Sequence, residues 1–346
     1  MSKVHPFDRY ADFTDVAVLK EASNKPLRKS MRVNTLKISV EQFQAWGNAK
    51  NWQMTPVPWC NSAFYIDREN REQALGKDLL HLLGAAYMQE AASMLPVELL
   101  DPQPGEMILD MSAAPGSKST QVASRLQGRG LVVCNDIQEK RLWTLKTALH
   151  RSGAWNNLVT RKVGQWFSKQ MTERFDRVLC DAPCTAQGTA RKDSDALDFC
   201  GPENIGKMAK LQRELLESAI DATKVGGIIV YSTCTLTPEE NEETIASMLR
   251  RFPEQIEVVD PRTIDPKFQS LQKGIEDSEL VQTKLGFEKP VPVIRLWPQT
   301  YDTEGFFCAV LRKLKPTRHV VDQPWVHFQE EELPAARLIE WSARLV

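Results

Sequence analysis

Two cysteines follow two apolar segments that have the pattern of buried strands. Cys184 stands three residues after Phe175–Asp181, and Cys234 directly follows Ile228–Thr233. A cysteine at a strand end, partly exposed and near helix N-termini, can carry a reactive thiolate. A thiolate that adds to carbon 6 of a pyrimidine ring activates carbon 5, and such covalent catalysis divides one difficult step into easier ones. Asp181 is placed to donate a proton or a hydrogen bond to ring nitrogen 3.

The presence of a second thiol decides between a structural and a catalytic interpretation. One cysteine at a strand end is more often a core residue than a catalyst. Two cysteines on neighbouring strand ends favour catalysis, with the second thiol or a nearby base helping to remove the carbon-5 proton. The cysteines form no C-x-x-C pair and their number is odd, so no metal site and no disulfide scaffold is expected. We interpret the remaining cysteines as structural: Cys60, Cys134, Cys180, Cys200 and Cys308.

Strands and helices alternate from about residue 84 onward. Strands are expected at 107–110, 131–136, 158–160, 175–181, 228–233 and 306–311, and helices at 85–100, 119–126, 139–151, 202–223 and 238–251. Strands separated by helices of this length indicate an α/β fold with a mostly parallel, doubly wound sheet. Because ligands of such sheets bind at the carboxyl ends of the strands, both thiols are expected to open onto one crevice.

The first strand end of this sheet has the composition of a cofactor loop. Asp110 is followed by Met-Ser-Ala-Ala-Pro-Gly-Ser-Lys118, whose small residues let the backbone approach a ligand before a helix begins. The next strand ends at Asp136, an acid suited to binding ribose hydroxyls or, alternatively, to capping a helix. The loop matches neither the phosphate-binding nor the dinucleotide glycine pattern. These features predict a nucleoside-type cofactor, without separating a nicotinamide dinucleotide from S-adenosylmethionine.

The N-terminal part of the chain has a different pattern. Residues 1–24 are typical of an amphipathic helical lead, and residues 30–75 alternate between extended and helical patterns, which indicates a small α+β unit. The segment 25–37 contains five basic residues and no acid, although the net charge of the chain is −1. This segment suits either a solvated surface or a patch that neutralises phosphates, and we take Arg28, Lys29 and Arg32 as candidate RNA contacts.

Composition excludes several classes of protein. No apolar run approaches the length of a membrane span, and the first ten residues lack the apolar core of a signal peptide. The balance of apolar and charged residues is that of a globular protein. We therefore expect a cytoplasmic monomer without membrane partners.

Four motifs together resemble the NOL1/NOP2/Sun family of RNA cytosine-5 methyltransferases. They are Phe175–Ala186, Ser112–Lys118, Asp136–Arg141 and Ser232–Asn241, and the resemblance runs from about Leu27 to Lys313. Within the family, 26–37, 56–60 and 191–193 are most similar to the bacterial F type, which acts on 16S ribosomal RNA. The resemblance implies a Rossmann-like S-adenosylmethionine-dependent methyltransferase sheet, preceded by a small N-terminal α+β RNA-binding domain.

The resemblance also implies roles for single residues. Cys234 would be the nucleophile, Cys184 would assist product release, and Asp181 would contact the cytosine and lie near the cofactor. Asp136 would hold the ribose of S-adenosyl-L-methionine, and Arg141 its carboxylate. The methionine part would be held by a loop of seven residues: Ser112, Ala113, Ala114, Pro115, Gly116, Ser117 and Lys118.

Some positions depart from the family, and other functions stay open. Ser112 replaces Cys or Ala, and Val163 replaces an Asp near the adenine. The chain ends at Val346, before the further C-terminal region of F-type relatives, so it is either a compact variant or a fragment. Transfer RNA is an alternative substrate. A DNA cytosine-5 methyltransferase is a second alternative, but the Ser-Thr-Cys sequence that ends at Cys234 argues against it. A third is a catalytically weakened RNA-binding or assembly factor, and Val163 is the one feature that favours it.

The predicted organisation has three parts. Residues 1–80 form the helical lead and the RNA-binding domain, residues 81–315 form the catalytic domain, and residues 316–346 form a C-terminal tail.

Overall fold

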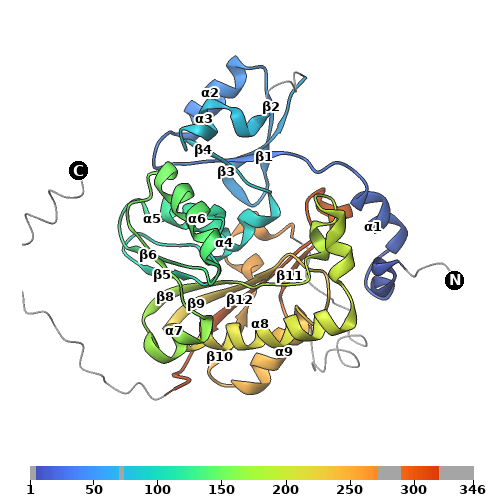
Figure 1. Ribbon diagram of the computed structural model, residues 1–346, viewed down its shortest axis with the longest axis vertical. Coiled ribbons are helices and arrows are strands. Elements are labelled where there is room, and N and C mark those ends of the chain that lie inside the picture. Colours follow the sequence, from blue (N-terminus) through green and yellow to red (C-terminus); the bar gives the residue numbers. More distant parts are fainter. Residues whose placement is uncertain (1–4, 70–73, 272–289, 319–346) are drawn as a thin grey trace, which may run out of the picture.

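The structure contains two β-sheets, each with its own core. The computed structural model describes residues 5–69, 74–271 and 290–318. A four-stranded sheet near the N-terminus has the order β2-β3-β1-β4, and a larger eight-stranded sheet follows it in the chain. Figure 1 shows the smaller sheet and its helices above the larger one. No helix of the described residues is long and apolar enough to cross a membrane.

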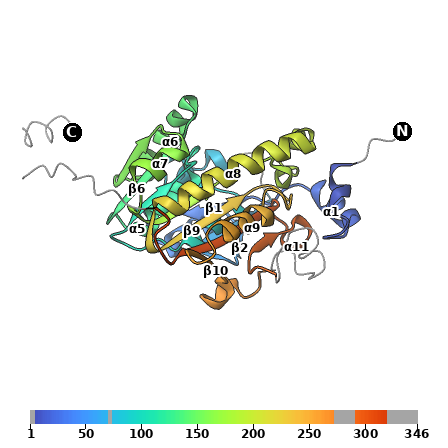
Figure 2. The ribbon, with the colours of Figure 1, turned by 90° about the horizontal axis from the view of Figure 1, so that it is seen from below.

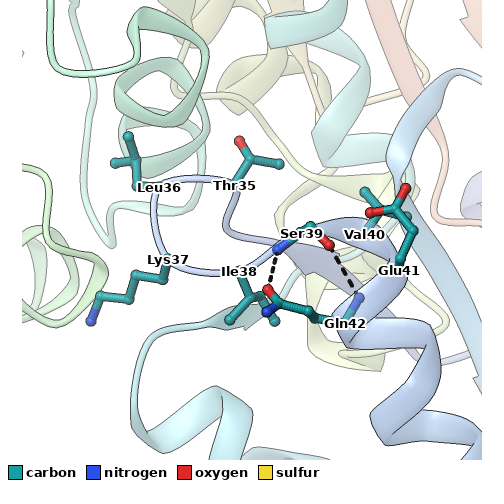
Figure 3. A pocket seen from close by; sticks show the side chains of 8 residues that line it. All are labelled: Thr35, Leu36, Lys37, Ile38, Ser39, Val40, Glu41 and Gln42. Atoms are coloured by element: carbon teal, nitrogen blue, oxygen red, sulfur yellow. Dashed lines mark hydrogen bonds between the residues drawn. The ribbon is translucent and has the colours of Figure 1, made fainter.

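The smaller sheet is antiparallel and packs against helix α2. Its core includes Phe43, whose ring stacks on Phe64 with 5.7 Å between centroids. Helix α2 starts with a capping box, in which Ser39 Oγ accepts from Gln42 N and Gln42 Oε1 accepts from Ser39 N (Figure 3). The elements of this region are η1 (Pro6–Tyr10), α1 (Val16–Ser23), β1 (Ser30–Val33), α2 (Val40–Ala49), β2 (Gln53–Val57), β3 (Cys60–Asp67), η2 (Leu75–Lys77), α3 (Leu79–Leu82) and β4 (Ala86–Met88).

Strand β4 replaces the start of a predicted helix. The apolar pattern of residues 85–100 predicts one helix, but Ala86–Met88 pairs with β1 and only the later part is helical. The reason is tertiary, because β1 offers a sheet edge whose hydrogen bonds outweigh local helix propensity. The smaller sheet therefore takes its last strand from beyond residue 80. The helical part consists of η3 (Ala92–Met94) and α4 (Leu95–Leu100).

The larger sheet has the strand order β10-β12-β9-β8-β5-β6-β7, with β11 paired to β12. Strands β5 to β9 pair in parallel, and β10, β11 and β12 add antiparallel pairs. The strands are β5 (Met107–Asp110), β6 (Leu131–Asn135), β7 (Asn157–Thr160), β8 (Phe175–Asp181), β9 (Thr223–Thr233), β10 (Ile256–Val259), β11 (Ile294–Leu296) and β12 (Phe306–Lys313).

Helices cover both faces of the larger sheet. Along β5, Ile108 packs into the cluster with α4, α5 and α6, whereas Leu109 packs into the cluster with α7, α8 and α9. This alternation is the two-residue period of a strand that is buried on both sides. Figure 2 shows α8 and α9 across one face of the strands. The elements that connect the strands are α5 (Ser117–Leu126), α6 (Glu139–Ser152), α7 (Gly164–Gln170), η4 (Gln187–Thr189), η5 (Ser194–Phe199), α8 (Pro202–Ala222), α9 (Glu242–Arg251), η6 (Pro261–Thr263), η7 (Pro266–Phe268) and α11 (Pro298–Tyr301).

The predicted α/β class is confirmed, but β10, β11 and α7 were not predicted, and further differences concern the ends of elements. Strand β8 has the predicted bounds, but α9 begins at Glu242 instead of residue 238. The four preceding residues form a turn, in which Asn241 N and Glu243 N both donate to Pro238 O. This turn directs Glu240 inward, where it is fully buried. Most of the predicted tail, from residue 319 onward, lies outside the described residues, as do residues 1–4 of the helical lead.

Candidate active site at the strand ends

The two predicted thiols are in contact. Cys184 Sγ and Cys234 Sγ lie 3.4 Å apart, and both cysteines are free and partly buried. Their strands, β8 and β9, are parallel neighbours, so the loops at their carboxyl ends meet. The hydrogen bond with Cys234 raises the pKa of the Cys184 thiol well above its ordinary value, and burial raises it further. Both effects disfavour the thiolate form of Cys184.

Asp181 forms an ion pair at the same edge. Lys118 Nζ donates to Asp181 Oδ2 at 2.7 Å, and Ser232 Oγ donates to Asp181 Oδ1 at 2.6 Å. Burial is the largest single effect and disfavours the Lys118 ammonium, but the charge and the hydrogen bond of Asp181, together with the charge of Asp110, raise the pKa of Lys118 overall. A cation is thus fixed in the crevice, 5.6 Å from the centroid of the Phe306 ring. This pair can donate to a ring oxygen or nitrogen and accept from an amino group.

The loop between β5 and α5 approaches the sheet closely. Gly116, at the N-terminus of α5, has φ of +109°, and a Cβ there would lie 2.9 Å from Ala148 Cβ on α6. The peptide bond between Ala114 and Pro115 is cis. Ala113 N donates to Asn135 O at 2.7 Å, which joins the loop to the end of β6. The first backbone N–H groups of α5 have no acceptor within the helix, and no side chain caps them.

Asp136 and Arg141 lie together beneath this loop. Asp136 is 2% exposed, and its carboxylate accepts from Ala114 N at 3.2 Å and from Gln138 N at 2.9 Å. Arg141 pairs with Asp136 at 3.3 Å and also donates to Ala114 O. Gln138 is the N-cap residue of α6, but its side chain accepts no hydrogen bond from the helix. The Asp136 carboxylate instead accepts from the backbone N–H of Gln138. Its ribose contact and the carboxylate contact of Arg141 stay predictions.

The residues around the loop fit a nucleoside-type cofactor. Ile137 and Val163 keep about half of their surfaces exposed, at 56% and 51%, on the loops after β6 and β7. Arg161 Nε donates to Ile137 O at 3.3 Å, so these loops are adjacent. Exposed apolar side chains on these two loops suit the planar base of such a ligand.

Two acids near the thiols were not assigned roles from the sequence. Asp110 is 1% exposed and accepts from Ser119 Oγ at 2.7 Å, and burial raises its pKa to about 6. Its position at the first strand end was the available signal. Glu240 binds the loops of both cysteines, and its one signal was its place within the Ser232–Asn241 motif.

Arg32 requires a correction. Its side chain is 2% exposed and donates to Gln89 Oε1 at 2.8 Å and to Thr120 Oγ1 on α5 at 3.0 Å. Burial lowers its pKa to about 10. The guanidinium joins β1 of the smaller sheet to the helix behind the cofactor loop, and it presents no surface to a phosphate. The prediction that Arg32 contacts RNA is therefore wrong for this structure.

The other two candidate RNA contacts are more accessible. Arg28 is half-buried, with its guanidinium 3.9 Å from the centroid of the Tyr65 ring and 3.9 Å from Asp302. Lys29 is exposed. Of the three predicted contacts, Lys29 has the charge and the exposure that a phosphate contact requires, and its role stays a prediction.

Sequence comparisons identify similar proteins. Residues 97–312 match the family described as 16S rRNA methyltransferase RsmB/F, and residues 10–91 match the N-terminal domain of 16S rRNA methyltransferase RsmF. Ribosomal RNA small subunit methyltransferase F of Vibrio campbellii is 41% identical over 84% of this chain and 58% of the relative. The protein of the same name from Cronobacter sakazakii is 40% identical over 94% of this chain and 68% of the relative. The chain thus spans about three fifths of the length of these relatives.

Solved structures give the same picture of the fold. A methyltransferase homologue from Pyrococcus horikoshii is 34% identical, has a TM-score of 0.72 and is matched over 86% of this chain and 90% of its own. NSun6 from the same organism is 22% identical, with a TM-score of 0.75 over 90% of this chain and 98% of its own, and supports the fold alone.

Proposed function

Because the chain belongs to the 16S rRNA methyltransferase RsmB/F family, we propose that it methylates carbon 5 of a cytosine in ribosomal RNA through a covalent bond from Cys234 to carbon 6. Family membership confirms the resemblance found in the sequence and the expected cofactor, S-adenosyl-L-methionine. The cytosine-5 chemistry rests on one observation, the contact of two thiols at 3.4 Å beside the Lys118–Asp181 pair.

Cys234 is the attacking thiol in this proposal. Cys184 is held neutral, since its hydrogen bond with Cys234 and its burial both raise its pKa. Addition of the Cys234 thiolate to carbon 6 moves negative charge toward ring nitrogen 3 and oxygen 2. The Lys118 ammonium, oriented by Asp181, stabilises that charge by a hydrogen bond or a proton. Asp181 retains lone pairs for the exocyclic amino group.

The loop at 112–118 and the acid of the second strand would hold the cofactor. Bound S-adenosyl-L-methionine supplies an electrophilic methyl group. Gly116 allows the backbone to approach the methionine part, and Asp136 and Arg141 would bind the ribose and the carboxylate. Val163 is about half exposed and would offer an apolar contact to the base on this side.

Release of the product requires two bonds to break. After carbon 5 is methylated, its proton leaves to a base, and the electron pair of that C–H bond restores the ring double bond as the bond from carbon 6 to the Cys234 sulfur breaks. Cys184 lies at contact distance from that sulfur and can donate its proton to the departing thiolate. The two thiols thus divide attack and release between them.

Trapping with RNA that contains 5-azacytidine tests the proposal. The protein should form an adduct that survives denaturing electrophoresis, and Cys234→Ala should form none. Cys184→Ala should accumulate an adduct with ordinary RNA, because addition proceeds and release does not. Cys200→Ala, a partly exposed cysteine outside the crevice, is the matched control and should behave like the parent protein. Loss of RNA binding without an adduct in Cys184→Ala would contradict the assigned roles.

The RNA substrate needs a separate test. Ribosomal RNA is proposed from the family and the relatives, and transfer RNA is the alternative. Mapping of 5-methylcytosine in both RNA pools of a deletion strain would distinguish them. A missing methyl group in transfer RNA alone would overturn the ribosomal assignment. The cytoplasmic location and the monomeric state stay predictions.

A further inference from the structure

Glu240 is a fully buried carboxylate in the turn between β9 and α9. It accepts hydrogen bonds from two loops and from α8, and the donors are Thr185 N (3.0 Å), Gln212 Nε2 (2.7 Å), Thr237 Oγ1 (2.8 Å), Thr235 Oγ1 (3.3 Å) and Thr185 Oγ1. All these donors are neutral. Among the described ion pairs, none includes Glu240, so its negative charge is solvated by hydrogen bonds without a nearby cation.

One half of these bonds fixes the Cys184 loop. Thr185 directly follows Cys184, and both its N–H and its hydroxyl donate to Glu240. Gln212 of α8 donates to Glu240 and also to Pro183 O, at 2.8 Å. The residues on both sides of Cys184 are therefore tied to Glu240, directly or through one side chain.

The other half fixes the Cys234 loop. Thr235 directly follows Cys234, and its hydroxyl lies 3.3 Å from Glu240 Oε1. The neighbouring Asn241 donates to Thr235 O at 3.1 Å and accepts from Thr233 Oγ1 at 2.6 Å. Residues before and after Cys234 are consequently held by the same turn. One carboxylate thus joins the two loops whose sulfurs are in contact.

We propose that Glu240 is a positioning residue, which holds the loops of Cys184 and Cys234 so that the two sulfurs lie at contact distance. The use of the two thiols in catalysis rests on the proposed function, whereas their juxtaposition does not. The charge of Glu240 also raises the pKa of Cys184, after the larger effects of the hydrogen bond with Cys234 and of burial, so Cys184 should ionise more easily without it. Without the bonds, the two loops would separate.

The rate of disulfide formation between Cys184 and Cys234 reports how closely the two thiols are held, and it needs neither RNA nor cofactor. Diamide oxidises two thiols to a disulfide and is itself reduced to the hydrazine, and peptide mapping identifies the Cys184–Cys234 product. Glu240→Ala should close this disulfide at least about tenfold more slowly than the parent, which corresponds to about 1.4 kcal/mol. Glu242→Gln is the matched control, because Glu242 is equally buried but binds Arg295 instead of the cysteine loops. It should close at the parental rate.

The pH profile of alkylation measures the charge. In Glu240→Gln, hydroxyl donors can turn to accept from the new amide, so most of the hydrogen-bond framework survives and the charge is lost. Iodoacetamide labelling of Cys184, followed by mass spectrometry, should then rise at lower pH than in the parent. With 5-azacytidine RNA, this variant should give adducts through Cys184 as well as through Cys234.

The outcomes separate this inference from the proposed function. If folded Glu240→Ala closes the disulfide at the parental rate, the positioning role is refuted. An unchanged Cys184 profile in Glu240→Gln refutes the effect of the Glu240 charge. If the parent protein forms no RNA adduct at all, the covalent mechanism fails, while the disulfide and alkylation results still decide the role of Glu240. Near-UV circular dichroism of each variant establishes that it is folded.

Discussion

Gly116→Ala should weaken cofactor binding far more than an equally strained substitution elsewhere. Gly116 has φ of +109°, and a methyl group at this position would lie 2.9 Å from Ala148 Cβ. Backbone strain of this kind costs about 1–3 kcal/mol. Ordinary contacts begin at 3.4 Å, so the loop and α6 would have to separate by about 0.5 Å. Such overpacking adds about 1–3 kcal/mol to the loss of stability.

Gly105→Ala provides the control for backbone strain. Gly105 has φ of +100°, and a Cβ there would have no neighbour within 4 Å. In urea unfolding, both variants should therefore be less stable than the parent by the cost of backbone strain. Gly116→Ala should be less stable by the cost of overpacking as well. Isothermal titration with S-adenosyl-L-methionine should show a dissociation constant at least about tenfold weaker for Gly116→Ala and unchanged for Gly105→Ala. Equal affinities of the two variants would refute the place of this loop in the cofactor site.

Three further predictions concern charged groups. Burial, and then the charge of Glu304, raises the pKa of Glu90 to about 8. The contribution of Glu90 to the free energy of unfolding should therefore be full below its ordinary pKa, about pH 4.5, and should be lost as pH rises through 8. Glu90→Gln should flatten this decline in urea midpoints measured from pH 5 to 9. Lys29→Glu should weaken RNA binding and reduce its salt dependence in fluorescence anisotropy. An unchanged salt dependence would show that Lys29 does not contact a phosphate. Asp136→Asn should lower cofactor affinity in isothermal titration, with Glu139→Gln, an exposed acid on the same helix start, as the unaffected control.

Local pattern was sufficient to predict six of the eight strands of the larger sheet, all except β10 and β11. Strand β8 was predicted with its observed bounds because Phe175–Asp181 is a short apolar run between polar turns. Strand β4 was missed because its pairing with β1 depends on a partner about fifty residues earlier in the chain, which no local window contains. The start of α9 was missed because Glu240 and Asn241 are satisfied by contacts outside their own helix.

The sequence by itself determined which side chains reach the crevice. Cys184 and Cys234 follow strands whose apolar pattern requires burial on both faces, and parallel strands end at one edge. Only the tertiary structure decided that their sulfurs touch, that Glu240 joins their loops, and that Arg32 is enclosed between the smaller sheet and α5. These features depend on residues far apart in the chain, and a buried polar group takes its role from the partners that packing brings to it.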